Sequence, residues 1–161
     1  MDIYEFAMQM EKDGRDFYLD LAKKTSNSGL KNILTMMADS EAKHYNVFLS
    51  MKKNDKTQYT TDTEILTKVK NIFIKMKEEK EFDLDVSQVE LYKKALGIEK
   101  DGHKFYLEKA NEEKDPSRKE IFLKIADEEK SHCVLLENMI GFVSQPDSWL
   151  EDSEWYHLDE N

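Results

Sequence analysis

AMQMEKDGRDFYLDLA at residues 7–22 is repeated as ALGIEKDGHKFYLEKA at residues 95–110, and nine of the sixteen positions are identical. The two copies lie 88 residues apart. In each copy, the glutamate of the shared EKDG is followed thirty residues later by the pattern Glu-x-x-His. The duplication therefore supplies four glutamates and two histidines in matched positions. They are Glu11, Glu41, His44, Glu99, Glu129 and His132.

The composition and the apolar spacing favour an all-α fold. With 161 residues, the chain is long enough for one domain with a substantial core. It contains only five glycines and two prolines, and 36% of its residues are charged, which is typical of long amphipathic helices. Apolar stripes predict long helices over about residues 2–24, 30–53, 87–110 and 116–140, and a shorter helix from about residue 61 to residue 76.

Several of these helices carry terminal signals. Ser87, with Glu90 three positions later, is expected to open the third long helix as a capping box. Asp115 is a natural N-cap, and Pro116 suits the first position of the last helix because its missing N–H is not needed there. Gly141 is expected to end that helix.

The connectivity predicts a ferritin-like four-helix bundle, because two hairpins with short loops are joined by a crossover of about 30 residues. We expect the bundle to occupy residues 1–144 and the short helix of the crossover to lie across it. Residues 145–161 form an acidic tail with many aromatic side chains. A free tail rarely carries so much apolar surface, so we expect it to dock on the bundle or on a partner subunit.

The spacing of the six Glu and His residues places them at one level of this bundle. Residues three apart on a helix differ by roughly 60° in direction and about 4.5 Å in height, so Glu41 and His44 can reach the same ion. Glu11 lies about 14 residues before the first turn and Glu41 about 14 residues after it. Both therefore lie near mid-height, and the second hairpin repeats the arrangement.

Four inward carboxylates need compensating positive charge. Unpaired, they would repel one another and cost several kcal/mol each in desolvation, whereas two divalent cations would neutralise them. Oxygen and nitrogen ligands without thiolate favour two iron ions, two manganese ions or a mixed pair over a structural zinc. The alternative is that these are surface residues of Glu-rich helices. That alternative does not explain two matched motifs on stripes that are expected to face inward.

Two more residue pairs recur near the expected site. Tyr18 and Tyr106 stand seven residues after the glutamate of each copy. Each phenol is a candidate catalytic group that could hydrogen-bond a ligating carboxylate or donate to a bound peroxide, or it is a buried core tyrosine. Gly14 and Gly102, three residues after the same glutamates, indicate either a close helix approach or room for a small ligand such as O2 or peroxide.

Other chemically active residues fit simpler roles. His103 follows Glu99 by four residues, but its counterpart in the repeat is an arginine, so a place on the flank or surface is favoured. Cys133 is interpreted as a small core residue rather than a redox centre. Glu154 and His157 in the tail also have the Glu-x-x-His spacing, which we interpret as an accident rather than a second metal site.

Charge and cysteine content exclude several classes of function. A formal net charge of −10 argues against nucleic-acid binding, which needs a basic face. No apolar run approaches the roughly 20 residues of a membrane helix, and the first residues do not resemble a signal peptide. The single cysteine allows neither an internal disulfide nor a metal site of four thiolates. We therefore expect a cytoplasmic protein that binds neither nucleic acid nor membrane.

The phrases MEKDGRDFY and IEKDGHKFY, together with the two Glu-x-x-His motifs, resemble the rubrerythrin branch of the ferritin-like superfamily over roughly residues 2–141. The resemblance implies a di-iron centre in which Glu41 and Glu129 bridge the ions. It also implies that Glu11 and Glu99 are terminal carboxylate ligands and that His44 and His132 are nitrogen ligands.

The resemblance also implies an activity: reduction of hydrogen peroxide, or oxidation of Fe(II) by O2 or peroxide, in the response to oxidative stress and commonly as a homodimer. The alternatives are a non-catalytic iron-storage or metal-handling protein, and a scaffold that binds a partner through its tail. Two departures stand out. Gly102 replaces an additional ligating glutamate of the family, and the chain lacks the four cysteines of a rubredoxin domain, so a separate protein must donate electrons.

Overall fold

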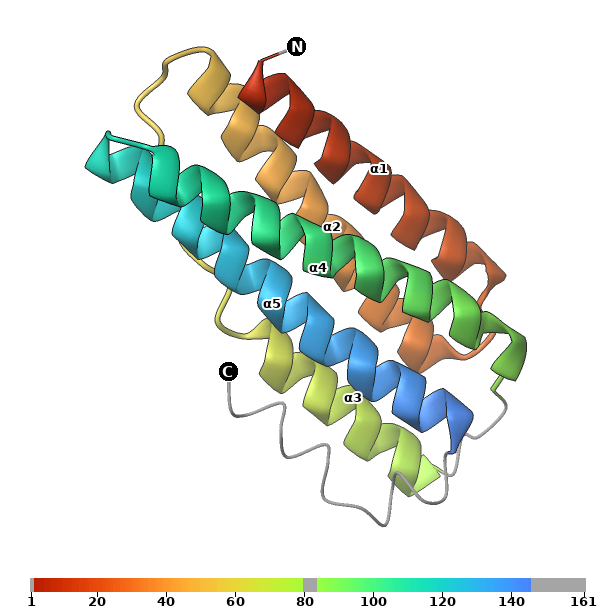
Figure 1. Cartoon of the computed structure of the whole chain (residues 1–161). Coiled ribbons are helices and arrows are strands. Elements are labelled where there is room, and N and C mark those ends of the chain that lie inside the picture. Colours follow the sequence, from red (N-terminus) through yellow and green to blue (C-terminus); the bar gives the residue numbers. More distant parts are fainter. Residues whose placement is uncertain (1, 80–83, 146–161) are drawn as a thin grey trace.

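The computed structural model describes residues 2–79 and 84–145, which form an all-α bundle (Figure 1). No β-strand occurs in this described part of the chain, and none of its helices has the length and hydropathy needed to cross a bilayer. The predicted ferritin-like four-helix fold is confirmed. Its elements are α1 (Ile3–Lys24), α2 (Ser28–Lys52), α3 (Ile65–Glu79), the 3-10 turn η1 (Val86–Gln88), α4 (Val89–Glu112) and α5 (Pro116–Ser144).

Each hairpin turns over three residues and restarts at a side-chain cap. Residues 25–27 join α1 to α2, and residues 113–115 join α4 to α5. At the start of α2, Asn27 Oδ1 accepts a hydrogen bond of 2.9 Å from the N–H of Leu30. At the start of α5, Asp115 Oδ1 accepts one of 2.9 Å from the N–H of Ser117, and Pro116 lies in the first turn as predicted. These short turns return each chain segment directly beside its predecessor.

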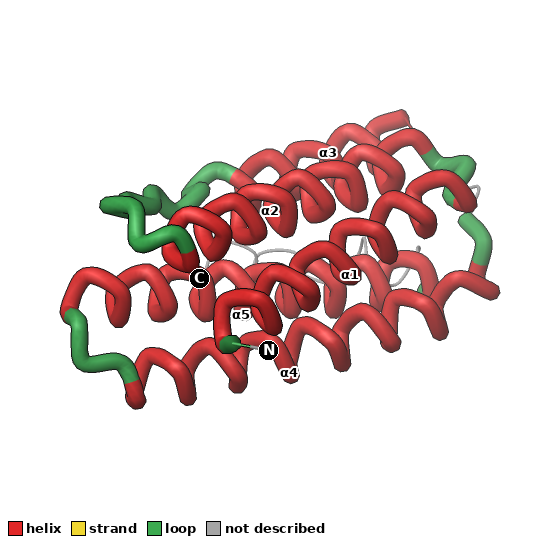
Figure 2. The backbone as a smooth tube through the Cα atoms, turned by 90° about the horizontal axis from the view of Figure 1, so that it is seen from above, coloured by secondary structure: helices red, strands yellow, loops and turns green. Residues whose placement is uncertain are grey.

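The crossover carries α3 along one flank of the bundle. Figures 1 and 2 show α3 lengthwise beside the long helices, and it buries Val69, Phe73 and Met76. The ring of Phe73 lies 5.4 Å from that of Phe142 on α5. The expectation that this helix lies across the bundle is therefore wrong. A straight apolar stripe is buried along its whole length only when the helix runs along the groove that receives it.

Two predicted helix ends also differ from the structure. The cap before α4 is Asp85 rather than Ser87: its Oδ1 accepts the N–H of Ser87 at 2.9 Å, and a 3-10 turn precedes the α-helix. Gly141 does not end α5, which continues to Ser144. No glycine in the described residues has a positive φ, so Gly141 does not adopt the left-handed conformation that ends many helices.

The core consists of two apolar clusters separated by the level at which the repeated motifs lie. The larger cluster includes Leu34, Phe73 and Leu136, and the smaller one includes Phe48 and Phe122. On every long helix, the residues of one cluster precede the Glu and His positions and those of the other follow them. A polar layer therefore divides an otherwise apolar interior. The predicted tail interaction concerns residues 146–161, which lie outside the described residues.

Candidate metal centre

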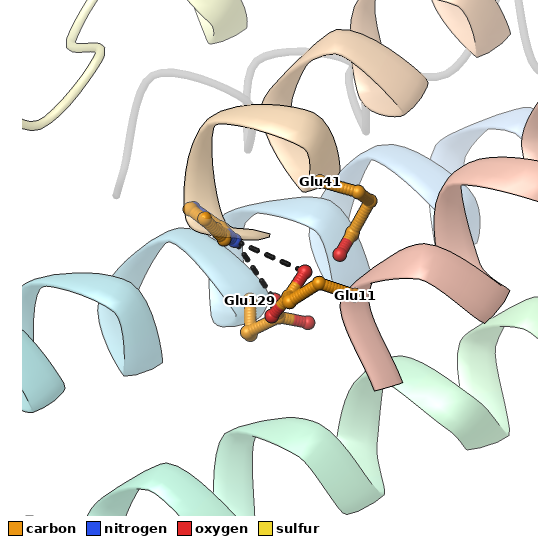
Figure 3. A group of neighbouring side chains, drawn as sticks. Glu11, Glu41 and Glu129 are labelled. Atoms are coloured by element: carbon orange, nitrogen blue, oxygen red, sulfur yellow. Dashed lines mark ion pairs between the residues drawn. The ribbon is translucent and has the colours of Figure 1, made fainter. Parts of the chain in front are cut away.

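The bundle brings the six predicted ligands together in its interior. One glutamate comes from α1 and one from α4, while α2 and α5 each provide a glutamate and a histidine. In Figure 3, Glu11, Glu41 and Glu129 point toward one another from three different helices. None of the six residues is more than 4% exposed, so the interpretation as surface residues is wrong. Their identities are Glu11, Glu41, His44, Glu99, Glu129 and His132.

The six side chains form two overlapping groups that could each hold an ion. Within each group, one potential ligand atom from every residue lies within 4.8 Å of the others. Glu41 and Glu129 belong to both groups, as expected of residues that bridge two ions. The first group adds Glu11 and His44, and the second adds Glu99 and His132.

The histidines face the carboxylates through the same ring atom. His44 Nδ1 lies 3.4 Å from Glu11 Oε2 and 3.4 Å from Glu129 Oε1. His132 Nδ1 lies 3.2 Å from Glu99 Oε1 and 3.3 Å from Glu41 Oε1. The two imidazole rings are 6.4 Å apart. Each histidine therefore points one nitrogen at a terminal glutamate and at one shared glutamate.

The hydrogen bonding of this layer shows that the donor set fits cations. Buried polar atoms almost always have a hydrogen-bond partner. In the described residues, the buried side-chain nitrogen and oxygen atoms without a hydrogen-bond partner all belong to the six candidate ligands. Oxygen and nitrogen atoms that face one another unpaired are what metal ligands offer before a cation is bound. These atoms are Glu11 Oε2, Glu41 Oε1, His44 Nδ1, Glu99 Oε2 and Glu129 Oε1.

The pKa values of the two shared glutamates are shifted toward the protonated form. Burial raises the pKa of Glu41 well above its ordinary value, and repulsion by Glu11 and Glu129 raises it further. Burial, followed by repulsion from Glu99 and Glu11, raises the pKa of Glu129 in the same way. Like charges this close cannot all ionise in a low-dielectric interior.

The terminal glutamates are ionised instead. Burial favours a higher pKa for Glu11 and Glu99, but attraction to the neighbouring His44 or His132 and hydrogen bonds outweigh it and lower the pKa of both. Burial likewise disfavours the charged form of His44, yet the adjacent Glu11 raises its pKa well above the ordinary value. Attraction between the terminal glutamates and the histidines therefore offsets part of the cost of burying these charges.

Both tyrosines of the repeat contact the layer. Tyr18 donates a hydrogen bond of 2.5 Å to Glu99 Oε1, and Tyr106 donates one of 2.6 Å to Glu11 Oε1. Each phenol thus contacts the terminal glutamate of the other hairpin. Burial, and then the nearby carboxylates, raises the pKa of both phenols well above the ordinary value, so they stay protonated and donate.

Glu128, which we did not predict, anchors one of the histidines. Its carboxylate contacts His44 Nε2 and the hydroxyl of Tyr59, and Oε1 accepts the N–H of Asp62 at 2.9 Å. Burial favours a higher pKa for Glu128, but its hydrogen bond with His44 outweighs this and lowers it. A carboxylate on the far nitrogen fixes the ring orientation and leaves Nδ1 for a metal ion. Tyr59 and Asp62 come from the crossover.

Comparison of the two repeats does not point to Glu128, because the matching residue 88 positions earlier is Ser40. A serine is too short to provide the same carboxylate contact. The only sequence signal was the extra glutamate directly before Glu129, which is unremarkable in a Glu-rich helix. The two halves of the site therefore differ outside the six matched residues.

The surroundings of His103 and Cys133 agree with the simpler roles expected for them. His103 is partly buried, and its Nδ1 lies 2.7 Å from the carbonyl oxygen of Ala126. Cys133 is buried, and burial raises the pKa of its thiol to about 12, as expected of an unreactive core residue. Glu154 and His157 lie outside the described residues.

A bundle of two helical hairpins with this ligand set at its centre defines the class of ferritin-like proteins that bind two metal ions. A scan against protein-family models matched the model described as Rubrerythrin over residues 2–140. The chain belongs to the rubrerythrin family, whose members typically bind a di-iron centre. Comparisons with curated proteins and with solved structures gave no match.

Metal binding is expected to release protons and to strengthen as pH rises. Glu41, Glu129 and His44 have raised pKa values in the metal-free layer, and each must lose its proton to bind a cation. Each proton released changes the association constant about tenfold per pH unit. Calorimetry with Mn(II), in two buffers of different ionisation enthalpy, measures the release directly. Metal binding that releases no protons and has an affinity independent of pH would contradict the raised pKa values of these three residues.

Removing Glu128 is expected to weaken metal binding without unfolding the bundle. Glu128→Ala leaves His44 Nε2 without its acceptor, so Mn(II) affinity should fall by about 10- to 100-fold in a chelator competition. Glu128→Gln keeps one acceptor oxygen and should lose less. The matched control is Glu120→Ala on the same helix, whose side chain is 67% exposed and paired with Lys124. Equal affinity in Glu128→Ala and the unchanged protein would show that the contact does not orient the histidine.

Proposed function

We propose that this protein is a non-haem di-iron oxidoreductase that reduces hydrogen peroxide, with electrons delivered by a separate donor protein. The observation that supports it most is that, in the described residues, the buried side-chain nitrogen and oxygen atoms without a hydrogen-bond partner all belong to the six candidate ligands. When bound, an iron pair would supply two electrons, so that hydrogen peroxide and two protons become two water molecules. Glu11, Glu41 and His44 would hold one ion, and the matching residues of the second hairpin the other, with Glu41 and Glu129 shared.

The protein's own contribution is to keep protons beside the site. Peroxide reduction consumes two protons, and each hairpin supplies one buried phenol. Tyr18 is held at Glu99 by its 2.5 Å hydrogen bond, and Tyr106 at Glu11 by one of 2.6 Å. Because the pKa of each phenol is raised by burial, the proton is present at neutral pH. We assign the two tyrosines to proton delivery, with one at each end of the ligand layer.

The assembly distinguishes catalysis from storage. Iron storage requires a shell of many subunits that encloses a mineral, whereas a redox enzyme of this size needs only its own site. We propose a homodimer, to which the donor protein delivers one electron at a time. Sedimentation analysis of the 161-residue chain should give twice its mass of 19.0 kDa. A large hollow assembly would favour the storage function instead.

Peroxide should oxidise the iron-loaded protein faster than it oxidises free iron. Stopped-flow mixing of the protein loaded with two Fe(II) per chain should show oxidation by hydrogen peroxide at least about tenfold faster than the same concentration of free Fe(II), a barrier lower by about 1.4 kcal/mol. O2 is the matched oxidant, and faster reaction with O2 than with peroxide would indicate a ferroxidase. If neither oxidant oxidises the iron-loaded protein faster than free Fe(II), the proposed function is wrong.

Removing either phenol should slow peroxide reduction while metal binding persists. Tyr18→Phe and Tyr106→Phe keep the buried ring and delete only the proton donor, so the rate should fall by about 10- to 100-fold with unchanged iron content. Tyr92→Phe is the control, because its hydroxyl contacts Gln88 at 3.2 Å rather than a candidate ligand. Three variants with the same rate as the unchanged protein would assign both tyrosines a structural role only.

A further inference from the structure

A cavity of about 440 Å³ opens between α1 and α4 and reaches the ligand layer. Its floor includes one shared glutamate from each hairpin, Glu41 and Glu129. Its walls are mostly apolar and include Met10, Phe17 and Ile98. A pocket of this volume, with apolar walls and a few polar groups at one end, has the character of a small-molecule site.

Two glycines keep the floor of the cavity open. A Cβ on Gly14 would lie 3.4 Å from Glu41 Oε2, and one on Gly102 would lie 3.2 Å from Glu129 Oε2. Side chains at these positions would stand between the cavity and the two shared glutamates. Their recurrence in the repeat therefore leaves one oxygen of each shared carboxylate facing the space.

The two repeats differ in sequence at the rim of the cavity. Phe6 and Phe105 form an aromatic pair with ring centres 5.2 Å apart. The positions related to them by 88 residues hold Lys94 and Phe17, where the ammonium lies 5.9 Å from the ring centre. Only this second pair lines the cavity. A lysine thus stands at the cavity in the position that holds an aromatic ring in the other repeat.

The cavity is much larger than hydrogen peroxide needs. A water molecule occupies about 30 Å³ of liquid, and a dry cavity of about 150 Å³ binds benzene. Hydrogen peroxide therefore fills a small fraction of about 440 Å³, whereas an aromatic ring with a short substituent fits within it. Asp13 and Asp101 outnumber Lys94 among the charged residues at the rim, and buried carboxylates form the floor, so the lining as a whole disfavours an anion.

We propose that this cavity is a substrate site for neutral organic hydroperoxides, ROOH. The apolar group R packs among Met10, Phe17 and Ile98, and the O–OH end faces Glu41 and Glu129. The inference rests on the proposed peroxide reduction and names its substrate class. The net change is ROOH + 2 H⁺ + 2 e⁻ → ROH + H2O, in which the O–O bond breaks. The same electron donor protein supplies both electrons, and solvent supplies the protons through the tyrosines.

Binding can be measured without turnover, using 2-phenyl-2-propanol, the alcohol product of cumene hydroperoxide. Calorimetric titration of the manganese-loaded full-length protein should show saturable binding. Ile98→Trp places a bulky ring at the mouth of the cavity and should raise the dissociation constant at least about tenfold. The matched control is Leu107→Trp, which alters a residue of the same helix that is similarly exposed but outside the cavity. It should change binding by less than about twofold.

Turnover of the iron-loaded protein then tests the substrate class. The ratio of kcat/KM for cumene hydroperoxide to that for hydrogen peroxide should fall at least about tenfold in Ile98→Trp and stay unchanged in Leu107→Trp. Reduction of hydrogen peroxide without alcohol binding would overturn the substrate assignment and leave the proposed function intact. Loss of activity toward both peroxides in the unchanged protein would refute the proposed function itself. A dimer that hides this face, seen as no alcohol binding and as dissociation of Ile98→Trp, would also overturn the assignment.

Discussion

Four carboxylates in two overlapping groups lie buried between two apolar clusters, and this negative charge constrains the rest of the structure. Each isolated carboxylate would cost several kcal/mol to desolvate, and mutual repulsion adds to that cost. The raised pKa values of Glu41, Glu129 and His44 favour protonation of these groups, which reduces the repulsion. Two divalent cations would replace that compensation with four positive charges. The side-chain caps and three-residue turns matter because they set the depth at which every ligand enters this layer.

The duplicated sequence gives a site that is symmetric at its centre and asymmetric around it. The six candidate ligands and the two tyrosines occupy matching positions in the two repeats, and each tyrosine donates a hydrogen bond to a glutamate of the other hairpin. Glu128 does not, because Ser40 stands at its counterpart. The crossover packs on one side only, where Tyr59 and the N–H of Asp62 complete the contacts of Glu128. The two candidate metal positions therefore offer the same ligand types in different surroundings, and such a difference can tune one ion relative to the other.

Most of the bundle and the placement of its six central residues could be predicted, because both follow from periodic patterns. Apolar stripes determine which helix faces turn inward, and the thirty-residue spacing determines depth. The predictions that were wrong concern a helix cap and a helix direction, where alternative local interactions compete. Asp85 displaced Ser87 as a cap, and the crossover helix followed a groove that only the folded bundle creates. Glu128 was missed because its role depends on contacts between segments far apart in the chain, which no spacing within one helix encodes. Gly14 and Gly102 did indicate room for a small ligand, but the size of the cavity depends on how α1 and α4 pack.

Gly102 links the charge of the site to its accessibility. The family resemblance implies an additional glutamate at this position, and a side chain there would project toward Glu129 and into the cavity, since even a Cβ would lie 3.2 Å from Glu129 Oε2. A fifth carboxylate would exceed the charge that two divalent ions balance and would need a proton or a more highly charged metal pair. Glycine removes that charge and leaves space beside the shared glutamates. Gly102 therefore adds no further carboxylate to the site and leaves the floor of the cavity open beside Glu129.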